Sequence, residues 1–187
     1  ADRIGSLGLV VCLDSFCGDY ERMWTTTSLR GLLSATLRVE VLHEGVHSGS
    51  ASGVVPDSFR IARRLLDRIE DPDTGRVLLQ DLWAEVPTGR EAEIEAVAED
   101  LGAALTASYP YAGPTQPTIP NTDPASQLRA KTWEPTLTVI GADGLPPTQT
   151  AGNVLRRSTT LGLSFRLPPT VESATAGAAL IAARPAD

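Results

Sequence analysis

The clearest pattern in this chain of 187 residues is an alternation of apolar and polar side chains over residues 32–42. Its apolar members are Leu33, Ala35, Leu37, Val39 and Val41. A period of two places such residues on one face of a strand, so a half-buried strand is predicted. Residues 159–167 repeat the pattern, with Phe165 expected inside and Arg166 on the outer face, and residues 137–140 predict a further strand.

An unbroken apolar run over residues 7–13 predicts a different kind of strand. The run shows no alternation and ends at Asp14, which is typical of a strand buried on both faces. Cys12 lies within it, and we expect this residue to be a buried, reduced thiol.

Three segments carry apolar residues at helical spacing: residues 58–69, 91–105 and about 170–183. Asp57 or Ser58 is available to cap the first of them. Residues 108–127 hold five prolines and predict an irregular loop. Strands near both ends of the chain, with helices between them, predict an α+β fold, a two-layer sandwich with an antiparallel sheet. Residues 76–130 would be an insertion into it.

Charge and hydropathy narrow the classes of partner. The net charge of −7 and the pI near 4.8 argue against a nucleic-acid or anionic-membrane partner. The longest apolar runs fall well short of the roughly 20 residues that a membrane span needs, and no signal peptide opens the chain. We therefore expect a soluble cytoplasmic protein. The abrupt start and the stop just after the last predicted helix suggest a piece of a larger protein.

Residues 43–47, His43-Glu44-Gly45-Val46-His47, match the H-E-x-x-H motif of zinc proteases. That chemistry needs a helix, because only helical geometry brings both imidazoles to one zinc ion. Here a strand pattern precedes the motif, Gly45 interrupts it and "SGSASG" follows it. We interpret the match as accidental, so a protease of this kind is an unlikely alternative.

Four motifs in order carry a family resemblance: "SLRG" (28–31), "HSGSASGVVPDS" (47–58), "TGRVLL" (74–79) and "GNVLRRSTTLGLSFRLPP" (152–169). They resemble the lid, or dimerisation, domain of the aminoacylase/carnosinase family of dinuclear-zinc metallopeptidases. The resemblance covers about residues 5–185 and is loose over 80–130. It implies a ferredoxin-like lid domain over residues 29–187, helices on one face of its sheet, and a piece of the catalytic domain over residues 1–28.

In that family the catalytic domain holds two zinc ions. The lid pairs with the lid of a second subunit and sends a histidine into the partner's active site. The resemblance therefore implies a homodimeric parent, a zinc dipeptidase or related amidohydrolase that cleaves a dipeptide or an N-acyl amino acid.

Four residues of this chain match functional positions of the family. His47 would donate a hydrogen bond to the substrate oxyanion of the other subunit, and Asn153 would be a further donor near the scissile carbonyl, where some relatives have Thr. Arg166 would bind the substrate's C-terminal carboxylate, and Asp14 would ligate one zinc ion. Simpler alternatives are a polar strand end for His47, a surface position for Arg166 and a loop cap for Asp14.

The sequence also departs from the family. The other metal ligands, an upstream His with Asp-x-Asp, a Glu-Glu pair and a final His, are missing, and one carboxylate cannot hold a zinc ion. We therefore expect no zinc in this chain and no activity from it alone. Without a closing strand after residue 183, the strand over 32–42 would lie at an exposed sheet edge. A stand-alone, non-enzymatic interaction module remains an alternative.

Overall fold

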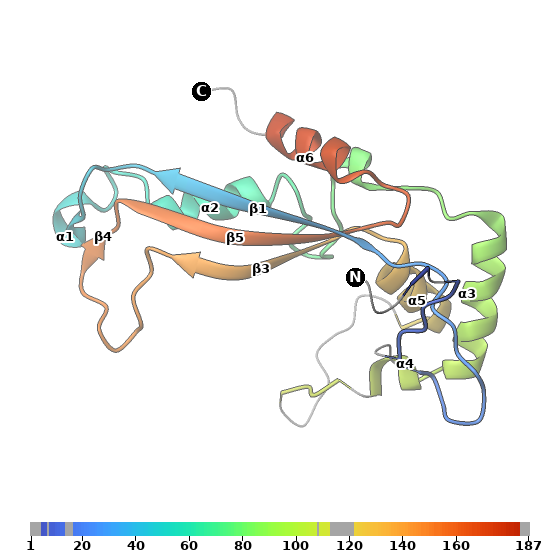
Figure 1. Ribbon diagram of the computed structural model, residues 1–187. Coiled ribbons are helices and arrows are strands. Elements are labelled where there is room, and N and C mark those ends of the chain that lie inside the picture. Colours follow the sequence, from blue (N-terminus) through green and yellow to red (C-terminus); the bar gives the residue numbers. More distant parts are fainter. Residues whose placement is uncertain (1–4, 7, 14–16, 108, 113–121, 184–187) are drawn as a thin grey trace.

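A three-stranded antiparallel sheet forms the centre of the protein (Figure 1). The computed structural model describes residues 5–6, 8–13, 17–107, 109–112 and 122–183. Strand β5 (Ser158–Leu167) lies between β1 (Gly31–Glu40) and β3 (Thr136–Asp143). The register of β1 and β5 runs from Gly31 opposite Leu167 to Glu40 opposite Ser158. The strands predicted over residues 32–42, 137–140 and 159–167 are confirmed, with small changes in their bounds.

The hydrophobic core lies on one face of this sheet. The buried apolar side chains of β5 are Leu161, Leu163, Phe165 and Leu167, none more than 4% exposed. Helices α2 (Ser58–Leu66) and α6 (Ser173–Ala182) add Ala62 and Ala176 to the same core. Both alanines are fully buried, and their small side chains let the helix backbones come close to the strands. The fold is therefore α+β, as predicted, while its ferredoxin-like character stays a prediction.

Helix α2 begins where the sequence predicts. The side chain of Asp57 accepts a hydrogen bond of 2.7 Å from the backbone N–H of Arg60, so Asp57 is the N-cap. In the core, the hydroxyl groups of Ser58 and Thr159 form a hydrogen bond of 2.9 Å, and both residues are fully buried. This bond joins the first turn of α2 to the start of β5.

A small second sheet lies at one end of the molecule (Figure 1, left). Strand β2 (Val46–His47) pairs antiparallel with β4 (Val154–Leu155), and the short helix α1 (Ser48–Ala51) follows β2. These elements lie beyond the end of β1 and before the start of β5. Neither strand could be predicted from periodicity, because each has only two residues.

The opposite end carries a helical lobe (Figure 1, right). It contains α3 (Thr88–Leu101), α4 (Ala104–Ala107) and α5 (Pro124–Thr132). The 3₁₀ turn η1 (Gln80–Leu82) lies outside this lobe, and its Leu82 belongs to the core of the sheet. The single helix predicted over 91–105 is in fact two helices, because Gly102 adopts a φ of +47° and ends α3. No helix in the described part of the chain is long and apolar enough to span a membrane.

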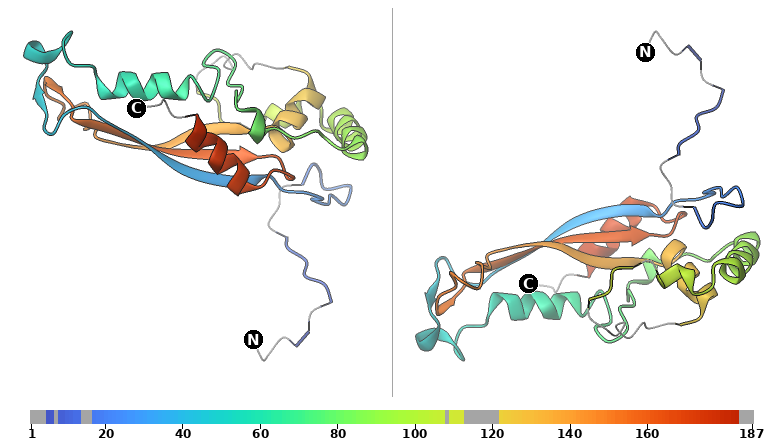
Figure 2. Two further views of the ribbon diagram at one scale, coloured as in Figure 1. Left: turned by 90° about the horizontal axis from the view of Figure 1, so that it is seen from above. Right: turned by 90° about the horizontal axis from the view of Figure 1, so that it is seen from below.

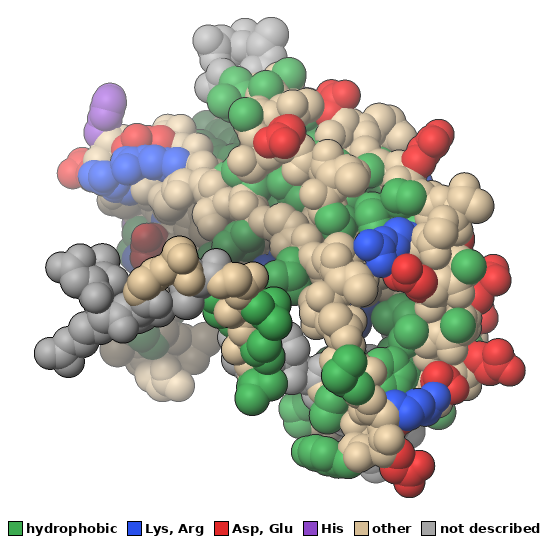
Figure 3. Space-filling model, turned by 45° about the vertical axis from the view of Figure 1, so that its right-hand side comes forward, with side chains coloured by type: hydrophobic (Ala, Val, Ile, Leu, Met, Phe, Trp, Pro, Cys, Tyr) green, Lys and Arg blue, Asp and Glu red, His purple; other side chains and the backbone are tan. Residues whose placement is uncertain are grey.

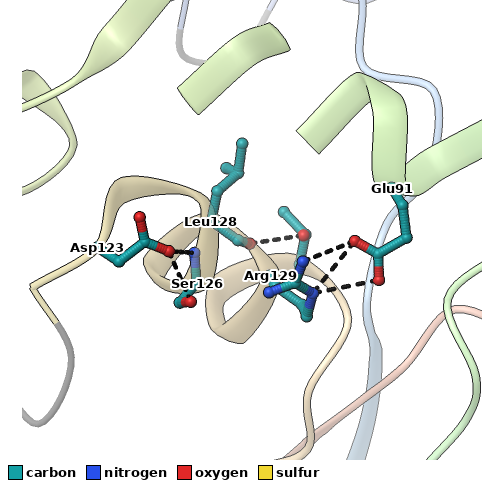
Figure 4. Close-up of polar contacts among 6 residues, drawn as sticks. Glu91, Asp123, Ser126, Leu128 and Arg129 are labelled. Atoms are coloured by element: carbon teal, nitrogen blue, oxygen red, sulfur yellow. Dashed lines mark hydrogen bonds and ion pairs between the residues drawn. The ribbon is translucent and has the colours of Figure 1, made fainter. Parts of the chain in front are cut away.

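Helix α5 was missed by the sequence analysis, which expected an irregular loop through residue 127. Asp123 caps it by accepting hydrogen bonds from the backbone N–H of Ser126 at 2.9 Å and from its hydroxyl at 2.7 Å, and Pro124 takes the first turn. Arg129 of α5 then donates hydrogen bonds to the carboxylate of Glu91 of α3 (Figure 4). Its Nε lies 3.2 Å from both Oε1 and Oε2, and its Nη2 lies 2.7 Å from Oε2. This ion pair fixes α5 against α3.

The expected buried strand over residues 7–13 is wrong for this chain. Residues 9–13 form no strand, and Figure 2 shows the segment running away from the rest of the molecule. Leu9 and Leu13 are 81% and 93% exposed, and Cys12 is exposed as well, so the predicted buried thiol is also wrong. An apolar run is buried only where another element covers it, and no described element of this chain does so.

Candidate functional site

His47 lies at the exposed end of β2 with its ring orientation fixed by the next turn. Its Nδ1 accepts a hydrogen bond of 3.1 Å from the backbone N–H of Gly49, so His47 is the N-cap of α1. A neutral imidazole that accepts at Nδ1 carries its proton on Nε2. The arrangement therefore presents an N–H donor at the outer edge of the ring.

Gly49 makes this orientation possible. A Cβ atom at this position would lie 2.9 Å from Cε1 and 3.1 Å from Nδ1 of His47. Both distances are below ordinary van der Waals contact, so any larger residue would push the ring away. This is the physical reason for a glycine two residues after the histidine in "HSG".

Asn153 lies beside His47. The two chain segments pair, with His47 opposite Val154, and the backbone N–H of Ser48 donates a hydrogen bond of 2.9 Å to the carbonyl of Asn153. Asn153 is exposed. The structure thus brings together the backbone segments of two residues that were selected from the sequence, His47 and Asn153.

The H-E-x-x-H residues do not form a helix. Residues 41–45 are irregular, and Val46 and His47 belong to β2. The helical geometry that one zinc ion needs from His43 and His47 is therefore absent, in agreement with the interpretation of the match as accidental.

Metal binding finds no support in the described residues. They contain no group of three or more His, Cys, Asp or Glu side chains that could hold a metal ion, whereas a zinc site uses at least three protein ligands. Asp14, the one predicted ligand, lies outside the described residues. The side chains present therefore do not fit the zinc ions that the family resemblance implies.

Arg166 lies at the other end of the long sheet. It is the second-last residue of β5, between Leu32 of β1 and Thr136 of β3, and it points to the outer face as predicted. From Ser158 to Arg166 the strand covers eight residues, or roughly 26 Å at 3.3 Å per residue. The structure does not bring Arg166 together with His47 and Asn153.

A cavity of about 730 Å³ opens beside Arg166. Its wall combines the end of the sheet, the segment before β1 and the helical lobe, and it includes the cationic side chains Arg30 and Lys131. Arg30 donates long hydrogen bonds of 3.4 Å to the carbonyl oxygens of Ala130 and Glu134. Burial lowers the pKa of the Arg30 guanidinium, and the positive charge of Arg166 lowers it further.

Arg30 and Lys131 were not selected from the sequence as functional residues. Arg30 lies inside the quoted motif "SLRG", and this motif could have identified it as a candidate. Lys131 is the single lysine of the chain, but its place beside Arg166 depends on α5, which the sequence analysis did not predict.

Comparisons with known proteins give matches among solved structures only. No protein-family model and no curated protein sequence matches the chain. The M20 family metallo-carboxypeptidase Sso-CP2 from Sulfolobus solfataricus is similar, with a TM-score of 0.64, 19% identity and 83% of this chain covered. The di-peptidase Dug1p from Saccharomyces cerevisiae has a TM-score of 0.65, 20% identity and 82% coverage. Human carnosine dipeptidase 1 has a TM-score of 0.64, 15% identity and 83% of this chain covered.

These matches concern only part of each larger protein. The chain spans 40% of the Sulfolobus protein, 31% of the yeast protein and 32% of the human protein. The resemblance inferred from the sequence is thus confirmed at the level of the fold: this chain folds like a part of the M20 metallo-carboxypeptidase and dipeptidase chains.

Proposed function

We propose that this chain is the lid, or dimerisation, domain of a dinuclear-zinc dipeptidase or related amidohydrolase. Residues 29–187 would form the lid, with residues 76–130 as an insertion, and residues 1–28 would be the end of the catalytic domain. The observation that carries the proposal is the separation of the donor groups. His47 and Asn153 lie near the start of β5, and Arg166 lies near its end.

This separation requires two subunits for one active site. A dipeptide spans at most about 7 Å when extended, far less than the roughly 26 Å of strand between the two groups. One substrate molecule can therefore contact His47 and Arg166 only if they come from different chains. A homodimer satisfies this requirement twice, with each chain giving His47 to its partner's site.

Each side chain has a role that suits its geometry. The Nε2–H of His47 would donate a hydrogen bond to the oxyanion that forms on the scissile carbonyl, and the Asn153 amide would be a second donor there. The Arg166 guanidinium would bind the substrate's C-terminal carboxylate through two parallel hydrogen bonds. The zinc ions that the family resemblance implies would be held by the rest of the parent protein.

The sheet edges provide surfaces for pairing. β1 and β3 pair with β5 on one side only, and no other described strand pairs with their outer edges. Val139 and Ile140 of β3 are 45% and 66% exposed. Free backbone groups beside apolar side chains favour association with another chain.

The proposal is tested by complementation in the parent enzyme. His47→Ala and Arg166→Ala each should lower dipeptide hydrolysis by orders of magnitude. Equal amounts of the two inactive variants, mixed and allowed to exchange subunits, should recover about a quarter of wild-type activity, because half of the dimers then hold one intact site. Asn153→Ala should complement Arg166→Ala but not His47→Ala.

Full activity of His47→Ala would contradict its assigned role. Inactive variants that exchange subunits without any recovery would show that the groups act within one chain. If the parent hydrolyses no dipeptide or N-acyl amino acid, the stand-alone interaction module becomes the better explanation, since the open sheet edges would serve such a module equally well.

A further inference from the structure

The cavity beside Arg166 has an unusual charge for this protein. Acidic residues outnumber basic ones by 23 to 16 in the whole chain, and red side chains gather at the right-hand edge of Figure 3. The described residues that line the cavity nevertheless include Arg30, Lys131 and Arg166 and no Asp or Glu. A recess with three cations and no carboxylate has a positive potential that favours an anionic ligand.

The register of the sheet brings the two arginines to the same face. Leu32 lies opposite Arg166, and side chains two residues apart on a strand point to the same side. Arg30 lies one residue before β1 and two before Leu32, and it lines the same cavity as Arg166. The two guanidinium groups therefore face the cavity together, and their mutual repulsion contributes to the lowered pKa of Arg30.

Helix α5 adds the third cation from the opposite wall. Leu128, Lys131 and Thr132 line the cavity and share one side of the helix, being three and four residues apart. The ammonium of Lys131 lies 5.8 Å from the ring centroid of Tyr109, which also lines the cavity. The Glu91–Arg129 ion pair holds the helix in this position (Figure 4).

None of the three cations has a carboxylate partner in the described structure. The hydrogen bonds of Arg30 go to two backbone carbonyl oxygens. The ion pairs between described residues involve other arginines, namely Arg22, Arg38, Arg90, Arg129 and Arg157. Three groups of the same charge thus share one recess with their donor capacity largely unused.

We infer that this recess selects substrates whose C-terminal residue carries a second carboxylate, an Asp or Glu side chain. Resting on the proposed function, the inference assigns the main-chain carboxylate to Arg166 and the side-chain carboxylate to Arg30 and Lys131. A single carboxylate would leave part of the positive charge without a partner. A dicarboxylate places one acceptor on each side of the recess.

Binding can be measured on the chain itself. Lys131 is the single lysine, so a limiting amount of an amine-acylating reagent modifies only this residue and the α-amino group, which serves as an internal control. Mass spectrometry then follows acylation of Lys131 in the presence of N-acetyl-L-glutamate or of N-acetyl-L-glutamine, an isostere that keeps the α-carboxylate but has an uncharged side chain. N-acetyl-L-glutamate should protect Lys131 at concentrations at least about tenfold lower, since a hydrogen bond to a charged group is worth that much. Equal protection by both compounds would overturn the inference.

Specificity is measured on the parent enzyme. The ratio of kcat/KM for Ala-Glu over Ala-Gln should exceed one, and Lys131→Gln should lower this ratio by about tenfold. Arg64→Gln, on the exposed side of α2, removes the same charge outside the cavity and should leave the ratio as it is.

The two proposals fail in different ways. A parent that cleaves both dipeptides equally, with no effect of Lys131→Gln on the ratio, would refute the acidic preference and leave the dipeptidase function intact. A parent that cleaves neither would refute the dipeptidase function, while protection of Lys131 by N-acetyl-L-glutamate would still support a dicarboxylate-binding recess.

Discussion

The buried hydrogen bond between Ser58 and Thr159 should show strong coupling in a double-mutant cycle. It joins α2 to β5 at 2.9 Å, with both residues at 0% exposure. Thr159→Val keeps the shape of the side chain but leaves the Ser58 hydroxyl without its partner, and Ser58→Ala does the reverse. An unsatisfied buried polar group costs about 1–3 kcal/mol, so each single variant should lose about that much stability.

The double variant should lose less than the sum of the two single losses. With both hydroxyl groups replaced by apolar groups, no donor or acceptor is left unsatisfied, and such replacement can be nearly neutral. The expected coupling energy is therefore about 1–3 kcal/mol. For a chain of this size each kcal/mol shifts Tm by roughly 2–4 °C.

Urea unfolding followed by circular dichroism measures the four free energies of the cycle. Thr36→Val is the matched control, because Thr36 is exposed on β1 and the same chemical change should shift stability by less than about 0.5 kcal/mol. Losses that add to within about 0.5 kcal/mol in the double variant would refute the reasoning, since additivity indicates independent sites. The result also matters for function, because this bond anchors the start of α2, which follows β2 and α1 in the chain, and β2 carries His47.

Two further predictions concern the site end and the helical lobe. Gly49→Ala should displace the His47 ring, because the added Cβ would lie 2.9 Å from Cε1; the histidine NMR signals should shift and parent activity should fall with little loss of stability, whereas unchanged signals would contradict the contact. Glu91→Gln should cost about 1 kcal/mol at neutral pH through loss of the two-bond contact with Arg129. The hydrogen bond from Arg129 lowers the pKa of Glu91 below its ordinary 4.5, so this stabilisation is complete above that value and disappears as the pH falls through the folded-state pKa. A stability difference between wild type and Glu91→Gln that persists in strong acid would show that the charge is not its source.

Local patterns of the sequence were sufficient for the strands and for the first helix. Side chains on a strand alternate between faces, and a slip of one residue would bury Arg166 and expose Phe165, so the pattern determines which face is inside. The cap at Asp57 needed only residues of the same turn. The close approach of His47 to Gly49 is also local, and for that reason the "HSG" motif could be recognised in the sequence.

Other features needed the tertiary structure because their cause lies in distant residues. The apolar run over 9–13 has the composition of a buried strand, yet it is exposed because no described part of this chain covers it. Helix α5 has a local cap, but its place beside Arg166 depends on Glu91, 38 residues earlier in the chain.

The sequence by itself thus determined the three strands of the central sheet with their inner and outer faces, because these follow from local periodicity, while the candidate residues His47, Asn153 and Arg166 came from motifs that resemble a known family. Only the tertiary structure decided which residues share a site. It placed His47 and Asn153 together, moved Arg166 to the other end of β5 and surrounded it with Arg30 and Lys131. The physical reason is that strand register and helix docking set distances between residues that are far apart in the chain, and no local pattern records those distances.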